Sequence, residues 1–134
     1  MPTLRKNRDV LHKYSLFDKY EAGIELYGWE VKAIKSGNID FKGSYVKPLQ
    51  NELYWINAKV APLGELKEDY VIDRSRKLLL HREEVNKLLH ISNAKSMAIV
   101  PVRLYTTRNL IKLEIATAKG KKKFEQSLAQ KRKS

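Results

Sequence analysis

The chain of 134 residues contains no cysteine, only six glycines and four prolines, and no long apolar run. The lack of cysteine excludes disulfides and thiolate metal sites, and it leaves the redox compartment open. No uncharged stretch approaches the roughly 20 apolar residues that a membrane-spanning helix needs, and residues 1–8 lack the apolar segment of a secretory signal. We therefore expect one cytoplasmic domain without a membrane partner, because single domains commonly run to about 100–150 residues.

The sequence is also poor in the patterns of catalytic sites. Its three histidines are His12, His81 and His90, and no two of them have the i, i+4 spacing of a zinc-binding helix. His81 and His90 fall near opposite ends of one expected helix, more than about 10 Å apart. This leaves only a pairing of His12 with either of them open as the acid and base of a ribonuclease. We expect a protein that is not an enzyme, with no catalytic residue, cofactor or metal.

Positive charge is abundant and gathers at the two ends of the chain. Lysine and arginine number 27 against 15 acids, which gives a net charge of +12. Residues 1–8 hold Arg5, Lys6 and Arg8 and no acid. Residues 119–134 hold one acid, Glu125, among the bases Lys119, Lys121, Lys122, Lys123, Lys131, Arg132 and Lys133. A body of nearly balanced charge with basic ends favours a polyanionic partner, most commonly nucleic acid, over a merely solvated basic surface.

Hydrophobic periodicity predicts a protein built mainly of strands. Alternating apolar residues predict strands over 14–26, 44–49, 53–61, 97–105 and 110–118, and helical spacing predicts short helices over about 28–36 and 82–90. Gly23 inside the first strand predicts a bulge or a sharp bend, and the polar stretch 64–73 predicts a loop. The pattern favours a mainly β fold with short helices, a small closed or nearly closed barrel of the oligonucleotide-binding (OB-like) type.

Three aromatic residues are candidates for stacking on bases. Alternation along 53–61 places Tyr54 and Ile56 on the core face and Trp55 on the opposite one. Tyr45 and Phe17 also fall opposite the predicted core faces of their strands. Exposed aromatic rings are the usual partners of unstacked bases. Because the helices of a small barrel can cover its outside, structural packing is the favoured interpretation for all three.

Several short sequence blocks follow one another in an order that is specific in combination. They are Asn7-Arg8, His12-Lys13-Tyr14, Glu21-Ala22-Gly23-Ile24, Gly28-Trp29-Glu30-Val31-Lys32, Ser44-Tyr45-Val46, Ala61-Pro62-Leu63, Ser75-Arg76-Lys77-Leu78-Leu79-Leu80-His81, Val100-Pro101-Val102-Arg103-Leu104-Tyr105 and Ala118-Lys119-Gly120-Lys121-Lys122. Over about residues 7–123 these blocks closely resemble the SsrA-binding protein family, small protein B.

The resemblance implies an RNA-binding adaptor. Members of that family have an OB-type barrel with two or three flanking helices, and they bind the transfer-RNA-like domain of transfer-messenger RNA. They carry this RNA to stalled ribosomes for trans-translation, in which the incomplete peptide is tagged for degradation. Elongation factor Tu with GTP arrives through the RNA, and the basic tail enters the decoding centre of the 30S subunit. A generic ribosomal or single-strand-binding barrel is the rival interpretation, because it would also be basic and rich in strands.

The resemblance also suggests which residues bind RNA. Asn7, Glu21 and Leu79 match family positions linked to RNA binding, and His12 and Tyr14 match a block near that surface. The expected RNA-binding set is completed by Arg8, Glu30, Lys32, Lys119, Lys121 and Lys122. For Glu30 and Lys32 an ordinary exposed helix surface is the alternative, and the last three lysines are expected on phosphates, where each contact releases counterions.

The two ends of the chain are expected to behave differently from its body. The predicted organisation is a flexible basic N-terminus over 1–6, an RNA-binding barrel over 7–118 and a disordered basic tail over 119–134. Within the tail, the expected ribosome contacts are Lys123, Phe124, Lys131, Arg132 and Lys133. Two segments depart from the family pattern: residues 9–11 lack bases, and the tail beyond Lys122 is shorter and differently composed.

Overall fold

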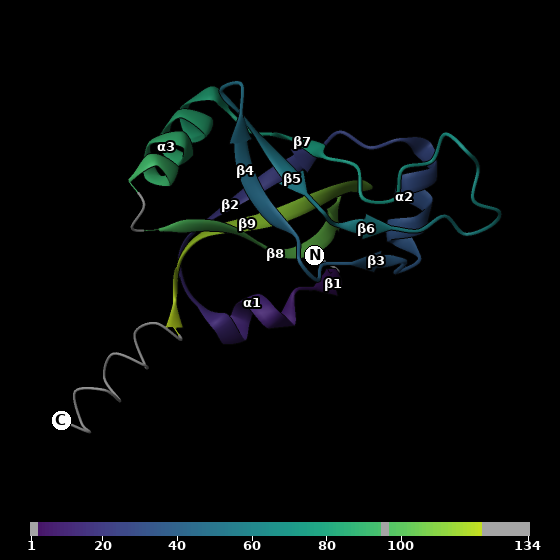
Figure 1. Cartoon of the computed structure of the whole chain (residues 1–134), viewed down its shortest axis with the longest axis horizontal. Helices are drawn as coiled ribbons and strands as arrows, with labels where there is room; N and C mark the ends of the chain where they lie inside the picture. The colour runs from purple at the N-terminus through teal and green to yellow at the C-terminus, as the bar shows by residue number, and fades with distance from the viewer. Residues whose placement is uncertain (1–2, 95–96, 122–134) are drawn as a thin grey trace.

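The computed structural model describes residues 3–94 and 97–121 (Figure 1). Its strands are β1 (Thr3–Lys6), β2 (Tyr14–Ile24), β3 (Ile39–Asp40), β4 (Tyr45–Leu49), β5 (Glu52–Ile56), β6 (Lys59–Val60), β7 (Arg76–Leu79), β8 (Ala98–Thr107) and β9 (Leu110–Gly120). Its helices are α1 (Arg8–Lys13), α2 (Gly28–Lys35) and α3 (Arg82–Asn93). The expectation of a mainly β fold with short helices is confirmed.

Seven strands form one antiparallel sheet, in the order β1-β8-β9-β2-β7-β5-β4. β3 and β6 pair separately as a small second sheet. The barrel expected from the sequence is not closed, because within the described ranges no hydrogen-bonded pairing joins the end strands β1 and β4. β4 instead packs against β8, and Figure 1 shows it crossing in front of the long strands. The sheet therefore curls over its own core without completing a ring of hydrogen bonds.

The N-terminal segment differs from the flexible stretch predicted over 1–6. Thr3–Lys6 form β1, which pairs with β8 through Thr3 opposite Tyr105 and Lys6 opposite Arg103. Leu4 packs against the main hydrophobic cluster, and this burial holds the strand at the free edge of β8. α1 follows at once and buries Val10 in a second, smaller cluster with residues of β8 and β9. The sequence analysis had assigned neither element.

Two tight hairpins fix the register of the sheet. Gln50 and Asn51 connect β4 to β5 with φ of 51° and 63°, and Arg108 and Asn109 connect β8 to β9 with φ of 51° and 67°. Two consecutive residues in this left-handed region are typical of the two-residue hairpin turn whose twist matches that of the strands. The strands predicted over 44–49 and 53–61, and over 97–105 and 110–118, flank these two turns.

The buried face of β5 is the reverse of the predicted one. Trp55 is fully buried and its ring lies 5.6 Å from that of Phe41, whereas Tyr54 and Ile56 are half-buried. The reason is Asn57, whose φ of 65° breaks the chain's alternation between β5 and β6. The prediction treated 53–61 as one strand in which the buried residues Ala58 and Val60 share a face with Tyr54 and Ile56. Because the alternation changes at Asn57, that rule assigned the wrong face of β5 to the core.

The irregularity of β2 also lies elsewhere than predicted. Pairing with β9 shifts register between Leu16 and Lys19, not at Gly23. Gly23 instead pairs with Leu79 of β7, and a Cβ added there would lie 3.2 Å from the Cβ of Leu79. The glycine thus permits a close approach between two strands.

Across the described part of the chain, every helix is too short or too polar to cross a membrane.

Candidate nucleic-acid interface

A row of exposed side chains runs along β2 and its neighbours. We call the set Phe17, Lys19, Glu21, Leu79 and Lys119 the β2 strip; all five are exposed. The ladder distributes them along β2: Lys119 pairs with Ser15 near one end of the strand, whereas Leu79 pairs with Gly23, two residues beyond Glu21, near the other end. The strip therefore brings Glu21 and Leu79 of the expected RNA-binding surface together, while Lys119 and Phe17 lie at the opposite end of β2.

Glu21 is held by a residue that the sequence analysis did not assign. The hydroxyl of Tyr105 on β8 donates to Glu21 Oε1 at 2.5 Å. Burial raises the pKa of Tyr105, and its hydrogen bond to Glu21 and the charge of that carboxylate raise it further. The hydroxyl therefore stays protonated as a donor well above neutral pH.

Tyr105 in turn lies beneath Arg103. The guanidinium carbon of Arg103 is 4.3 Å from the centre of the Tyr105 ring, the geometry of a cation–π contact. Arg103 Nε donates to Glu114 Oε2 at 3.3 Å, and its Nη1 donates to Thr3 Oγ1 at 3.0 Å. A chain of contacts thus runs from β1 across β8 and β9 to Glu21 on β2.

At the start of β2, basic and aromatic groups lie close together. Lys119 Nζ is 5.7 Å from the centre of the Phe17 ring, and more than half of the Phe17 side chain area is accessible to solvent. Lys121 Nζ donates to the backbone carbonyl of Leu11 in α1 at 3.3 Å. Phe17 is thus an exposed aromatic beside a base, the combination that suits stacking on nucleic acid.

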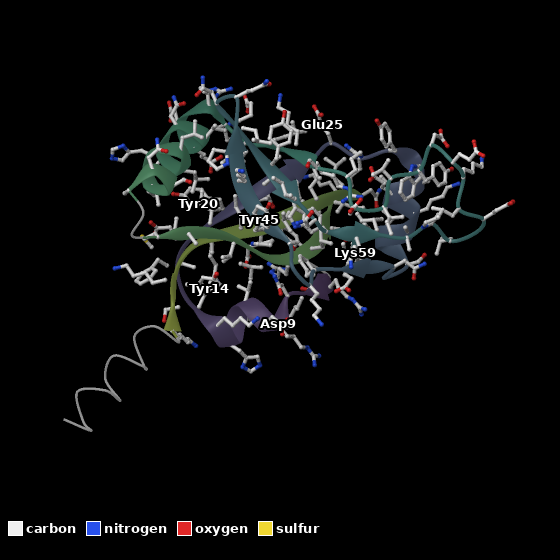
Figure 2. The ribbon with its side chains drawn as sticks, in the orientation of Figure 1. Asp9, Tyr14, Tyr20, Glu25, Tyr45 and Lys59 are labelled. Atoms are coloured by element: carbon white, nitrogen blue, oxygen red, sulfur yellow. The ribbon has the colours of Figure 1, made fainter. Side chains whose placement is uncertain are left out.

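Of the three aromatic residues considered from the sequence, only Trp55 has a purely structural role in the core. It is fully buried and contacts Phe41, as the favoured interpretation held. Tyr45 on β4 and Phe17 on β2 are instead exposed, so a purely structural role does not describe them. Figure 2 shows Tyr45 on the strand that crosses in front of the sheet.

The N-terminal candidates divide into buried and exposed groups. Asn7 is buried; its side-chain Nδ2 donates to Pro101 O at 2.9 Å and its backbone N–H to Val102 O at 2.8 Å. Arg8 and His12 are exposed on α1, and Tyr14 is half-buried where β2 begins. Figure 2 shows Tyr14 and the α1 residue Asp9 on the same side of the molecule, away from Glu25, which directly follows β2. The Asn7 amide nitrogen therefore forms a hydrogen bond that connects the segment between β1 and α1 to β8.

Glu30 does not lie on an exposed surface as the RNA-binding assignment requires. Its side chain is fully buried in α2, where Oε1 accepts from Arg74 Nη2 at 2.5 Å and from the backbone N–H of Tyr27 at 2.8 Å. Oε2 accepts from Arg76 Nε at 2.7 Å. Burial by itself would raise the pKa of Glu30, but these hydrogen bonds and the charge of Arg76 outweigh it and hold the pKa below its usual value. The exposed helix surface considered as the alternative for Glu30 is therefore wrong, and its burial gives no support to an RNA contact.

Arg76 connects this carboxylate to the surrounding chain. The fully buried guanidinium donates to the backbone carbonyls of Ala58 at 2.8 Å and Ile72 at 3.0 Å. Arg74 lies over the Tyr27 ring at 4.4 Å, and Tyr70 stacks on Trp29 with ring centres 4.4 Å apart. We call Glu30, Arg74 and Arg76 the α2 ion cluster. It fastens α2, β7 and the loop before β7 together; Lys32, on the same helix, remains exposed.

The histidines are not brought together. His12 lies on α1, while His81 precedes α3 and His90 lies within it, and Figure 1 shows these two helices well apart. The arrangement therefore gives no support to a ribonuclease site in which His12 pairs with one of the other two histidines.

Among residues 3–94 and 97–121, no three His, Asp or Glu side chains are grouped so as to hold a metal ion. Lys122 and the tail candidates Lys123, Phe124, Lys131, Arg132 and Lys133 lie outside the described residues.

The residues that the sequence analysis missed are Arg103 and Tyr105. Alternation along 97–105 predicts Val102 and Leu104 on one face, but a register shift between Pro101 and Arg103 puts Val102 in the smaller cluster and Leu104 in the main one. The two-residue period therefore gave no continuous signal along this strand for Arg103 and Tyr105. What the sequence could not supply was the neighbour across the sheet, because Glu21 is 84 residues away from Tyr105 along the chain.

Comparisons with known proteins agree on one family. The sequence model of the SmpB protein family matches residues 4–134. An SsrA-binding protein of Methylobacillus flagellatus is 39% identical over 133 residues, which are 98% of this chain and 86% of the relative. One from Dechloromonas aromatica is 44% identical over 121 residues, 89% of this chain and 81% of the relative. A chain of the solved structure "tmRNA-SmpB: a journey to the center of the bacterial ribosome" is 38% identical with a TM-score of 0.72, covering 87% of this chain and 83% of that one.

Proposed function

The chain belongs to the SmpB protein family, and from this premise we propose that it binds the transfer-RNA-like domain of transfer-messenger RNA. It delivers this RNA to stalled ribosomes for trans-translation, so that the incomplete peptide is tagged for degradation. Its relatives are SsrA-binding proteins, and its structural neighbour is a tmRNA–SmpB complex of the bacterial ribosome. Similarity over almost the whole chain supports carrying this function over.

The observation that carries the proposal is the β2 strip. Along β2 it presents exposed Glu21 and Leu79 near one end and Phe17 and Lys119 near the other, with Lys19 between them. Lysines neutralise phosphates, an aromatic ring accepts a base or ribose, and a carboxylate accepts hydrogen bonds from a guanine edge or a 2′-hydroxyl. A surface of this composition suits a folded RNA that is recognised by shape and a few specific contacts.

The finer parts of the function belong to the same proposal. The RNA-contacting residues are Asn7, Arg8, His12, Tyr14, Glu21, Lys32, Leu79, Lys119, Lys121 and Lys122. The body over 7–118 acts as a binding adaptor of the OB type rather than as a catalyst, and the curled sheet, in which β4 packs on β8, supports this type. The tail engages the 30S decoding centre, elongation factor Tu with GTP joins through the RNA, and the site of action is the cytoplasm.

A competition experiment separates this function from that of a generic single-strand-binding protein. A labelled transfer-RNA-like fragment is bound to the protein and then challenged with unlabelled fragment or with poly-U at equal nucleotide concentration and moderate salt. We expect the fragment to compete at least about tenfold better, because only it offers the folded shape as well as phosphates. Equal displacement by poly-U would favour the generic binder and contradict the proposal.

A further inference from the structure

We propose that Tyr105 is a positioning residue for Glu21, holding one carboxylate oxygen so that the other is presented to the RNA as a hydrogen-bond acceptor. The inference rests on the proposed RNA-binding function and adds to it a residue that acts through Glu21. It starts from an unusual feature of the outer sheet face: a tyrosine that is only 3% exposed, although its neighbours in the sheet are exposed or half-buried polar residues.

The register of the strands explains how Tyr105 reaches Glu21. Arg103 of β8 pairs with Glu114 of β9, which pairs with Glu21 of β2; one step along, Tyr105 pairs with Lys112, which pairs with Gly23. The two rows lie on the same face of the sheet because the side-chain period is two. From this position the phenol extends across β9 toward Glu21. Its hydroxyl then donates to Glu21 Oε1 at 2.5 Å.

Arg103 also restrains the Tyr105 ring, by lying over its face. Arg103 covers it at 4.3 Å and is itself held by Glu114 Oε2 at 3.3 Å and Thr3 Oγ1 at 3.0 Å. The charged groups facing the phenol are thus Glu21, Arg103 and Glu114. Burial and the adjoining Glu21 raise the pKa of Tyr105, which keeps its hydroxyl a donor under all ordinary conditions.

The contact has a direct consequence for binding. An exposed glutamate samples many rotamers, and ordering it on a ligand costs about 0.5–1.5 kcal/mol of side-chain freedom. The hydrogen bond from Tyr105 restricts these rotamers in advance and leaves Oε2 as the acceptor for a donor on RNA. It also reduces the repulsion between the carboxylate and phosphates, because part of the negative charge is already engaged by a donor. Glu21 can therefore face a polyanion at lower cost and in one defined orientation.

The test is a double-mutant cycle on RNA affinity. Wild type, Tyr105→Phe, Glu21→Gln and the double variant are titrated with a transfer-RNA-like fragment, and thermal melting establishes that each is folded. Tyr105→Phe keeps the ring beneath Arg103 and removes only the hydroxyl. We expect it to weaken binding about threefold to tenfold in the wild-type background and to have no further effect once Glu21 is glutamine. A merely structural tyrosine would lower affinity equally in both backgrounds, and that result would overturn the proposal.

Two further variants keep the test decisive. Tyr54→Phe on β5 is the matched control and is expected to bind as wild type does. Glu21→Asp keeps the charge but withdraws the carboxylate from the Tyr105 hydroxyl by one methylene, so affinity should fall by a similar factor even if Tyr105→Phe fails to fold. Wild-type affinity in Glu21→Asp would overturn the positioning role while leaving the proposed function standing. Failure of the wild-type protein to bind the fragment at all would overturn both.

Discussion

Glu21 and Glu30 both have carboxylates that accept hydrogen bonds from other residues, yet they lie in opposite environments. Glu30, in the α2 ion cluster, is fully buried and accepts from Arg74, Arg76 and the Tyr27 backbone N–H. Glu21, in the β2 strip, is exposed and accepts from the hydroxyl of Tyr105. The sequence analysis expected both in the RNA-binding set, Glu21 from the resemblance and Glu30 with an ordinary helix surface as its alternative, and the structure separates them.

The difference shows what makes a carboxylate available to a ligand. A buried carboxylate must have its acceptor sites filled by the protein, since an unpaired charge away from water is very costly. In Glu30 these sites are filled by Arg74, Arg76 and the Tyr27 backbone N–H. An exposed carboxylate with one internal partner can exchange its remaining water for a ligand donor at little net cost. The number of internal donors, more than residue type, distinguishes the structural cluster from the candidate interface.

The largest expected effect comes from Glu30→Gln. Removing the charge leaves the buried Arg76 guanidinium uncompensated, and breaking a buried pair in this way typically costs about 3–5 kcal/mol of unfolding free energy. Urea unfolding followed by tryptophan fluorescence measures it. Glu21→Gln is the matched comparison: because the residue is exposed, its unfolding free energy should change by less than about 0.5 kcal/mol, while its RNA affinity falls. If Glu30→Gln left the unfolding free energy unchanged and weakened RNA binding, the distinction between a structural Glu30 and an RNA-facing Glu21 would be contradicted.

The pH dependence of stability sharpens the same contrast. The pKa of Glu30 is lower in the folded protein than its ordinary value of 4.5, so the folded state binds fewer protons than the unfolded state in that range. The contribution of Glu30 is therefore complete at neutral pH and is lost as the pH falls through its folded pKa, below about 4.5. Urea midpoints measured from neutral pH down to about pH 3 should decline less steeply in Glu30→Gln than in wild type. Parallel declines would show that the ion cluster does not carry this dependence.

The smallest expected effect lies at the edge of the β2 strip. In Gly23→Ala the new Cβ would meet the Leu79 Cβ at 3.2 Å, so β2 and β7 must separate by a few tenths of an ångström. We expect a loss of stability of up to about 1 kcal/mol and about a twofold loss of RNA affinity, as Leu79 moves relative to Glu21. Gly28→Ala is the control, because beyond its chain neighbours and the backbone of its own helix the added Cβ meets no heavy atom within 4 Å. Equal RNA affinities in the two variants would show that the spacing of Glu21 and Leu79 does not matter.

Local patterns predicted the parts of the fold that depend on near neighbours. The helix over 28–36 is observed as Gly28–Lys35, and the strand over 110–118 as Leu110–Gly120. Both follow from periodic apolar residues and clear end signals, which act within a few positions. The same reasoning failed at β5, because the positive φ of Asn57 shifts the alternation without any marked change in residue type.

Other features had no local signal at all. β1 contains three bases or polar residues in four positions and is a strand only because β8 offers it an edge and the core accepts Leu4. Asn7 was predicted as an RNA contact from resemblance, yet its amide nitrogen is bonded to Pro101, 94 residues away. No pattern within a short window can foresee such partners.

The sequence by itself determined the basic character of the protein, its division into strands and short helices, and its family. These follow from composition, from local periodicity and from collinear motifs, each of which is a property of the chain before it folds. Only the tertiary structure decided which charged residues are free to meet a ligand. Burial and pairing depend on residues brought together from distant positions, so Glu30 is buried against Arg74 and Arg76 while Glu21 is exposed with the Tyr105 hydroxyl as its donor.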